Sequence, residues 1–319
     1  MKIHRNIDQL PVFKNAVVTI GTFDGVHEGH RQILNQLKEE AAKIMGETVI
    51  ITFHPHPRKV LKSDKPGIQL INTIEEKTEL LSNEGIGHLV IVPFTVEFSK
   101  LTAKEYVEDF LIKKFHPHTV IIGYDHHFGQ GRDGDYRLLE NYEESGSFRL
   151  KEIPEHILNA SAVSSTRIRT AILNGKIEEA NELLGYPFFF EGLVVEGDKL
   201  GRKLGYPTAN LKVEEEEKLV PGNGVYAVES QESGVGSQES GVGSQESKRL
   251  KGMMNIGIRP TLGGIRRVVE VNIFDFDKDI YGKRLRVYVK KRLRDEQKFN
   301  GLEELKAQLA KDKLAAQAS

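Results

Sequence analysis

The chain has 319 residues, a formal net charge of −1 and no cysteine. Without cysteine there are no disulfides, thiolate nucleophiles or cysteine-based zinc sites, and the composition fits a reducing cytoplasm. The near-neutral charge gives no indication of a nucleic-acid or membrane partner, and no apolar run approaches the roughly 20 residues that span a bilayer. We therefore expect a soluble cytoplasmic protein; its oligomeric state is left open.

In residues 16–153, short apolar runs alternate with amphipathic stretches. The candidate strands are 16–21, 48–53, 88–94 and 119–124. The candidate helices between them are 30–45, 74–85 and 102–115. Near-continuous apolar strands separated by helices indicate a parallel sheet covered on both faces, which binds ligands at the carboxyl ends of its strands. This pattern predicts an α/β domain of the Rossmann-like class, followed by two short helices at 164–175 and 177–185.

After Gly185 the pattern changes to strand-like runs separated by turn residues. Such runs indicate an antiparallel β-barrel, and a final amphipathic segment, 301–315, predicts a terminal helix. We place the boundary near residues 185–187, which gives an α/β domain over 1–185 and a β domain over 186–319.

A repeated segment lies in the second half, where residues 230–247 read SQESGVG twice and then SQES. A binding motif is one interpretation. Valine is the only apolar residue in each copy, which is too little to offset the entropy of ordering. We therefore expect a disordered hairpin loop between a strand that ends at Val228 and one that starts near Leu250.

The segment from Gly21 to His30 reads GTFDGVHEGH and follows an apolar strand. A helix is expected to begin near His27 or Glu28, and the free N–H groups at its start form a site for phosphate. His27 and His30 are three residues apart, so they point the same way on a helical turn. Two imidazoles aimed at one phosphate predict stabilisation of the charge that develops during in-line displacement. The alternative is a pair of histidines that only cap a helix.

A second element, SSTRIR, runs from Ser164 to Arg169. Its hydroxyl groups can cap a helix or donate to phosphate, and its arginines can bind a triphosphate through two hydrogen bonds. Alone, this element also fits an ordinary capped helix.

Together, GTFDGVHEGH and SSTRIR resemble the H-x-G-H nucleotidylyltransferases, and specifically the FMN adenylyltransferase module of bacterial FAD synthetases. The resemblance covers nearly all of residues 15–185, including TFHPHP (52–57) and GYDHHFG (123–129). It implies that His27 and His30 are catalytic and contact the ATP phosphates. It also implies that ATP is bound by Gly21, Phe23, Asp24, Ser165, Thr166 and Arg169.

The same resemblance places His54 and Asp125 at or near the flavin and nucleotide pocket. Asp125 stands where some members of the family have asparagine. Mg²⁺, bound mainly through the ATP phosphates, is the expected metal.

Residues 197–210 read GDKLGRKLGYPTAN. Glycines let backbone amides approach phosphate closely, and positive charge comes from Lys199, Arg202 and Lys203. Thr208 and Asn210 lie two residues apart, on one side of an extended segment, and their neutral oxygens suit Mg²⁺ beside ATP. A Gly/Pro-rich surface turn is the alternative.

Glu270 lies in VVEVNIFDF, a strand-like segment in which it alternates with Asn272. A carboxylate within such a strand is costly unless it is paired or functional. All 11 histidines lie at or before His156, so the second half has no imidazole base. Glu270 is therefore the predicted general base towards a hydroxyl group, with Asp275 and Asp277 as alternatives at the strand end.

The second half resembles the riboflavin kinase barrel that follows the adenylyltransferase module in bacterial FAD synthetases. The matching segments, within about 186–313, are GDKLGRKLGYPTAN, GVYAV, NIGIRPT, VEVNIFDF and KFNGLEELKAQLAKD. The resemblance implies that Thr208 and Asn210 position Mg²⁺ and ATP and that Glu270 activates the ribityl 5′-hydroxyl. It also assigns Gly197 and Lys203 to the ATP site.

The whole chain is thus expected to convert riboflavin and ATP to FMN and ADP, and then FMN and ATP to FAD and pyrophosphate. A nucleotidyltransferase for another acceptor, such as phosphopantetheine or a sugar phosphate, would leave the second domain unused. A non-catalytic flavin sensor or nucleic-acid-binding barrel would need both sets of motifs to arise by coincidence, and the chain has no basic-aromatic stripe.

Overall fold

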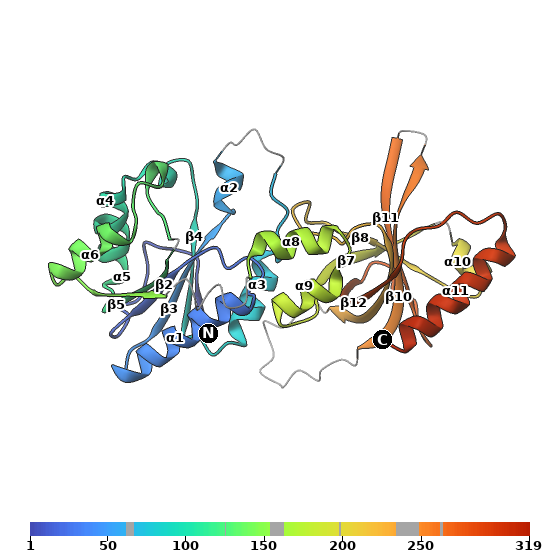
Figure 1. The fold of residues 1–319 in the computed structure, drawn as a ribbon, viewed down its shortest axis with the longest axis horizontal. Coiled ribbons are helices and arrows are strands. Elements are labelled where there is room, and N and C mark those ends of the chain that lie inside the picture. The colour runs from blue at the N-terminus through green and yellow to red at the C-terminus, as the bar shows by residue number, and fades with distance from the viewer. Residues whose placement is uncertain (62–66, 125, 154–162, 198, 234–248, 262–263) are drawn as a thin grey trace. The chain divides into compact units, whose positions relative to one another are not determined.

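A computed structural model describes residues 1–61, 67–124, 126–153, 163–197, 199–233, 249–261 and 264–319 (Figure 1). The chain divides into two compact units, Met1–Ser165 and Thr166–Ser319. Among the described residues, no helix has the length and apolar character needed to cross a membrane.

The first unit is built on a six-stranded parallel sheet in the order β1-β4-β3-β2-β5-β6. Its strands are β1 (Lys2–His4), β2 (Val17–Ile20), β3 (Thr48–His54), β4 (His88–Pro93), β5 (Thr119–Gly123) and β6 (Arg149–Ile153). The predicted parallel sheet and its four apolar strands are confirmed. The two edge strands were not predicted, because β1 is only three residues long and β6 reads RLKEI, with little apolar character.

Helices cover both faces of this sheet (Figure 1). On one face, α1 (Glu28–Lys43) and α3 (Ile74–Ser82) share a core with Val17 and Ile50. On the other face lie a helical segment over 103–115 and α6 (Tyr136–Glu144). That segment comprises α4 (Ala103–Glu105), a π-helix (Tyr106–Ile112) and α5 (Lys113–Phe115). Burial on both faces explains why the central strands are apolar without alternation.

Strand β2 is the topological switch point of the sheet. From β2 the chain moves to β3 and β4 on one side, and later to β5 on the other side. In open α/β sheets, ligands bind outside the carboxyl ends of the strands at such a point. The loop after β2, residues 21–27, lies there.

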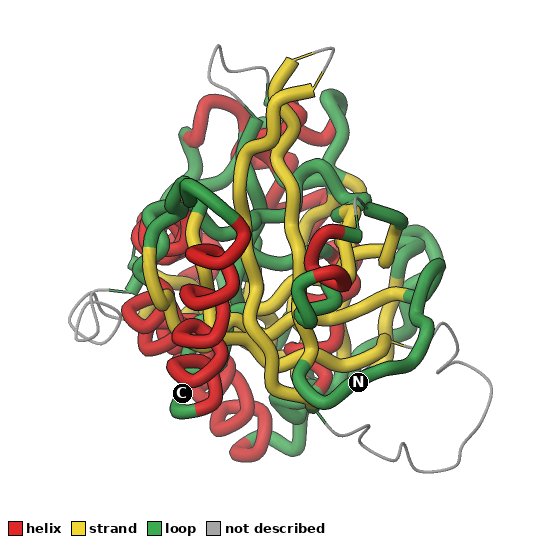
Figure 2. The backbone as a smooth tube through the Cα atoms, turned by 90° about the vertical axis from the view of Figure 1, so that its right-hand side faces the viewer, coloured by secondary structure: helices red, strands yellow, loops and turns green. Residues whose placement is uncertain are grey.

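The second unit is a closed antiparallel barrel in the order β10-β11-β8-β7-β12-β9. Its strands are β7 (Phe189–Val195), β8 (Ala209–Lys212), β9 (Gly224–Ser233), β10 (Leu250–Thr261), β11 (Gly264–Ile273) and β12 (Arg284–Arg294). The terminal helix α11 (Leu302–Gln317) packs against β9, β10 and β12 (Figure 2). The predicted barrel and terminal helix are confirmed.

Two helices that precede the barrel, α8 (Ser165–Leu173, apart from Ser165 itself) and α9 (Ile177–Leu184), belong to the second unit. Asn181 in α9 donates from Nδ2 to the carbonyl oxygen of Val289 in β12. The structural division therefore falls before these helices, whereas the sequence placed the boundary near residues 185–187. Composition changes only where the barrel strands begin, and it does not reveal which unit a helix packs against.

The first residues of the SQES repeat are part of a strand. Strand β9 continues to Ser233, and its backbone pairs with β12 from Val225 to that residue. The expected strand end at Val228 and loop start at residue 230 are therefore wrong. Ser230 is 1% exposed, so polar composition misled the prediction where backbone pairing decides the structure. Residues 234–247 of the repeat lie outside the described residues.

Candidate active sites

The loop after β2 delivers the two predicted histidines to the start of α1. His27 is the N-cap residue, and its Nδ1 accepts a hydrogen bond from the backbone N–H of His30 at 3.3 Å. The two rings stack with centroids 3.6 Å apart and an angle of 14° between their planes. The capping role and the shared orientation, which the sequence offered as alternatives, are both present.

Ser165 connects the second sequence motif to this pair. Because His27 accepts at Nδ1, its neutral ring carries hydrogen on Nε2, which lies 3.4 Å from Ser165 Oγ. The serine hydroxyl in turn donates to the backbone oxygen of Asp24 at 2.8 Å. This chain of hydrogen bonds fixes the tautomer and orientation of the imidazole.

Both imidazoles are neutral at pH 7. Burial lowers the pKa of His27 to about 4. Burial, and then the neighbouring His27 and Lys77, hold the pKa of His30 well below its usual range. The pair can therefore act on phosphate only through N–H hydrogen bonds and not as imidazolium cations. To do so, His27 would have to exchange Ser165 Oγ for phosphate as the acceptor of its single N–H.

Asp24, predicted to bind ATP, is only 2% exposed. Its Oδ1 accepts hydrogen bonds from the backbone N–H groups of Ile71 and Asn72, at 2.9 and 3.2 Å. In this structure the carboxylate thus holds the loop after β2 against the segment that leads into α3.

Lys77, which the sequence analysis did not single out, lies close to the same loop. Its Nζ donates to the backbone oxygen of Thr22 at 2.6 Å, and the residue is 6% exposed. Burial lowers the pKa of Lys77 to about 8, against the opposing effect of Asp24, so most of the ammonium stays charged at pH 7. The pattern TIEEKTELL reads as an ordinary amphipathic helix and gives no signal for this lysine.

The other predicted residues of this half occupy different settings. Gly21 follows β2 and packs against the ring of Phe23, which is 2% exposed and lies 5.0 Å from the His30 ring. His54 ends β3 and is exposed, and partial burial lowers its pKa. Thr166 and Arg169 lie in α8. Asp125 lies outside the described residues.

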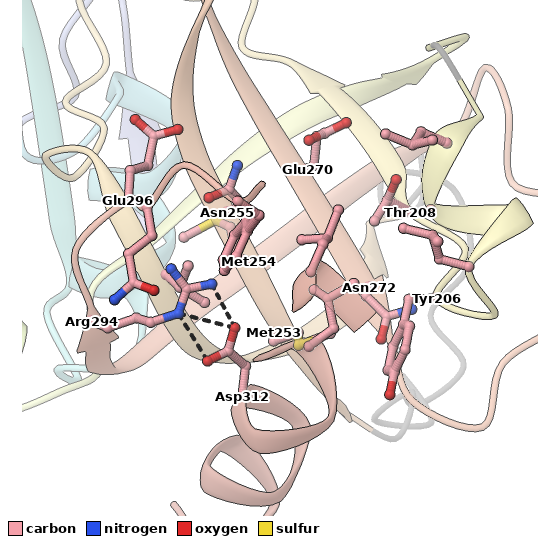
Figure 3. Close-up of a pocket in the computed structure, with 18 of the residues that line it drawn as sticks. Tyr206, Thr208, Met253, Met254, Asn255, Glu270, Asn272, Arg294, Glu296 and Asp312 are labelled. Atoms are coloured by element: carbon pink, nitrogen blue, oxygen red, sulfur yellow. Dashed lines mark hydrogen bonds and ion pairs between the residues drawn. The ribbon is translucent and has the colours of Figure 1, made fainter. Parts of the chain in front are cut away.

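In the barrel, three polar residues lie side by side across neighbouring strands. Glu270 of β11 pairs directly with Asn255 of β10 and with Asn210 of β8. Residues directly opposite each other in an antiparallel sheet project from the same face. Glu270 and Asn255 line a cavity of about 230 Å³, and Thr208 also contributes to its wall (Figure 3).

The rest of this cavity is largely apolar. Its apolar lining comes from residues 200–206, from β9 and β10, and from the terminal helix and the segment before it. It includes Leu204, Val225, Met253, Met254, Phe299, Leu305 and Leu309. One wall with a carboxylate, an amide and a hydroxyl therefore faces side chains suited to a flat organic ring system.

Arg259 is the partner that makes a carboxylate tolerable at this position. Its Nη2 lies 2.7 Å from Glu270 Oε2, and the Glu270 side chain is 14% exposed. The sequence indicated that Glu270 must be paired or functional, but it did not identify Arg259 as the partner. It also missed Glu296 and Asp312, two further carboxylates in the cavity lining. The alternatives Asp275 and Asp277 are exposed and do not line the cavity.

The described residues of the glycine-rich segment 197–208 pack closely against the strands that carry Asn210 and Asn272. A Cβ on Gly197 would lie 2.2 Å from Asn210 Nδ2, so a larger residue there would displace the Asn210 amide. Asn272 Nδ2 donates to the backbone oxygen of Pro207 at 2.6 Å, which fixes the chain just before Thr208. Lys203 ends the short helix α10 (Leu200–Lys203) and is exposed.

Comparison with known proteins assigns both halves. The FAD synthetase family model matches residues 10–167, and the riboflavin kinase family model matches residues 184–319. The bifunctional riboflavin kinase/FMN adenylyltransferase of Escherichia coli K12 is 38% identical over 311 residues, covering 98% of this chain and 94% of that protein. The protein of the same name from Bacillus subtilis is 35% identical over 306 residues, covering 94% and 91%.

A crystal structure named as a macrolide-efflux protein from Streptococcus pneumoniae has the same fold, with a TM-score of 0.85 and 31% identity. The match covers 99% of this chain and 98% of that one. Its name differs from those of the curated relatives, whereas both family models agree with them. We take only the fold from it. With both halves matched, the chain belongs to the bifunctional riboflavin kinase/FMN adenylyltransferase family.

Proposed function

We propose that the barrel cavity is the riboflavin kinase site and that Glu270 is its general base. The row formed by Asn255, Glu270 and Asn210 carries this proposal, because it sets a strand carboxylate between two amides beside Thr208. The apolar wall suits the isoalloxazine ring, and the polar row suits the ribityl chain. With Oε2 held by Arg259, Oε1 is the oxygen that takes the proton from the 5′-hydroxyl as it attacks the γ-phosphate of ATP.

The residues beside Glu270 fit Mg²⁺. Thr208 and Asn210 offer neutral hard oxygens, the ligand type that Mg²⁺ takes together with ATP phosphates. Among the described residues, no group of three histidine or carboxylate side chains could hold a metal ion. When bound, Mg²⁺ neutralises phosphate charge and orients the γ-phosphate. Gly197 and Lys203 complete the proposed ATP site.

For the second reaction, we propose that His27 and His30 donate hydrogen bonds to ATP while the FMN phosphate attacks the α-phosphorus and pyrophosphate leaves. The stacking of the two rings at the switch point of the sheet and the hydrogen bond that fixes the His27 tautomer support this role. The same site is proposed to bind ATP through Gly21, Phe23, Asp24, Ser165, Thr166 and Arg169, and the flavin through His54 and Asp125. A cytoplasmic location is also proposed, on the absence of cysteine.

Two single substitutions in the bifunctional chain test these roles together. Each variant is incubated with ATP and Mg²⁺ and either riboflavin or FMN, and the flavins are separated by chromatography. Glu270→Gln is expected to slow riboflavin phosphorylation by roughly 10²- to 10⁴-fold, with adenylylation of supplied FMN intact. His30→Ala is expected to slow FAD formation by on the order of 10²-fold, with FMN formation intact.

Asp275→Asn is the matched control for the base, because Asp275 is exposed and does not line the cavity. It should leave both rates unchanged. A folded Glu270→Gln enzyme with the wild-type kinase rate would refute the base assignment. Equal loss of both activities in either variant would indicate a folding defect.

A further inference from the structure

The backbone carbonyl of Thr22 receives two side-chain hydrogen bonds from different elements. Lys77 Nζ in α3 lies 2.6 Å from this oxygen, and Thr52 Oγ1 in β3 lies 3.3 Å from it. Thr22 is the second residue of the loop that leads from β2 to His27. Its carbonyl is therefore the point at which the sheet and α3 together fix that loop.

The position of Lys77 is itself fixed. The segment before α3 donates two backbone hydrogen bonds to Asp24, and the helix then begins with a capping box between Thr73 and Glu76. With α3 held at its start, and with Lys77 6% exposed, the ammonium cannot swing into solvent. Its place relative to the loop is set by the fold.

Lys77 also carries a buried positive charge that acts on the ring of His30. Both imidazoles are neutral, and departure of pyrophosphate needs positive charge near the phosphates, to which Lys77 would add beside the proposed Arg169 and Mg²⁺. The charge of Arg31 on α1 also lowers the pKa of His27. That charge is offset by ion pairs with Glu28 and Glu84. The charge of Lys77 lowers the pKa of both His30 and His54. Glu75 raises the pKa of His54, and Asp24 raises the pKa of Lys77.

We propose that Lys77 is a positioning residue for adenylyl transfer, which holds the Thr22 carbonyl and supplies fixed positive charge near His30. This inference rests on the proposed role of the two histidines. Because it is buried, Lys77 acts through the loop and through its field, without touching the substrate. The competing interpretation is that Lys77 only ties α3 to the loop.

Three substitutions separate charge from hydrogen bonding. Lys77→Met removes both, Lys77→Gln keeps a donor without the charge, and Lys77→Arg keeps the charge. With FMN supplied, we expect kcat for FAD formation to fall roughly 10- to 100-fold in the Met and Gln variants, the effect of one charge several ångströms away at an effective dielectric near 20. KM for FMN should change little, and Lys77→Arg should retain most of the activity. Riboflavin phosphorylation in the same samples reports the concentration of folded enzyme.

The pH profile gives a readout that a purely structural role would not move. Without the charge of Lys77, protonation of His30 is less unfavourable, so the acid limb of adenylylation should move to higher pH in the Met and Gln variants. Lys77→Arg should keep the wild-type profile.

Two controls isolate stability from charge. Thr73→Ala removes the cap of α3, at a cost of about 1 kcal/mol in protein stability, but leaves the ammonium in place. Lys218→Met removes another buried lysine, 4% exposed and 5.0 Å from the Phe188 ring centre in the second unit. Neither should change kcat for adenylylation.

A Lys77→Gln enzyme with wild-type kcat and pH profile would overturn the inference, and so would an equal loss of kcat in Thr73→Ala. If His30→Ala also kept the wild-type rate, the role of the histidines would fail with it. A slow His30→Ala enzyme beside an unchanged Lys77→Gln enzyme would defeat only the inference about Lys77.

Discussion

The rings of His27 and His30 are stacked 3.6 Å apart, so two positive charges there would repel each other strongly. Burial favours the same neutral state. A neutral imidazole donates one N–H and needs no proton uptake before it binds phosphate. In the proposed reaction the pair would therefore serve as hydrogen-bond donors, and positive charge would come from other groups, among them Lys77 in the role that we infer for it.

The buried imidazoles also make stability depend on pH. In the folded chain His27 binds a proton only near pH 4, whereas in the unfolded chain it does so near pH 6.5. Between these values the unfolded state binds more protons, so stability is full above pH 6.5 and falls as the pH drops towards 4. The expected loss from His27 is about 2 kcal/mol of unfolding free energy at pH 5.

Urea unfolding at pH 7, 6 and 5 measures this effect by comparison with His27→Asn, since asparagine caps a helix but does not titrate. The variant should show a shallower decline than the wild type. Parallel declines would mean that His27 does not carry the effect.

Sequence analysis can single out a residue when its type is unusual for its position in the chain. His27 and His30 belong to a motif that follows an apolar strand, and Glu270 is a carboxylate within an apolar strand. Lys77 and Arg259 were missed because each is an unremarkable charged residue along the chain. Their importance comes from what the fold places beside them, Thr22 and Glu270 respectively.

Among the elements, α11 depends on one buried ion pair with the barrel. Arg294 of β12 donates from Nε and Nη2 to Asp312 of α11, at 2.7 to 3.1 Å, and the aspartate side chain is 4% exposed. Asp312→Asn would leave the guanidinium buried and unpaired, so we expect a loss of about 3–5 kcal/mol of unfolding free energy. Kinase activity should fall as well, because α11 supplies Leu305 and Leu309 to the cavity.

Thermal and urea unfolding test this expectation against Glu214→Gln. Glu214 pairs with Arg284 on the surface, where both side chains are more than a third exposed, so its loss should cost less than about 1 kcal/mol. Similar effects in the two variants would show that burial does not determine the strength of the Arg294–Asp312 pair.

Helices and apolar strands were predictable because burial imposes a period on their sequence. The start of α1 lies at the predicted position, since its N-cap residue and the preceding strand end are both visible in the sequence. The end of β9 could not be predicted in this way. Residues Ser230–Ser233 belong to the strand because their backbone pairs with β12, and such pairing does not require a particular composition.

Across the whole molecule, the two compact units each have their own buried core. The family matches leave residues 168–183 outside both, and those residues form most of α8 and α9. Predicting two domains required only the change from α/β to β patterning. Assigning these two helices required knowing the barrel surface, such as the Val289 carbonyl that Asn181 binds.

The segment between β9 and β10 contains the rest of the SQES repeat. The ladder reaches Ser233 on one side and Leu250 on the other, so residues 234–247 can be replaced by a short turn without removing a described strand pair. Closing a shorter loop should raise the free energy of unfolding by about 1 kcal/mol, because loop entropy grows only with the logarithm of length. Both catalytic rates should stay at the wild-type level.

By contrast, replacing residues 230–247 removes the pairing of Ser230 through Ser233 with β12 and should lower the melting temperature. Chromatographic assays and thermal unfolding of the two deletions decide the matter. A collapse of the kinase rate in the folded 234–247 replacement would show that the repeat contributes to activity.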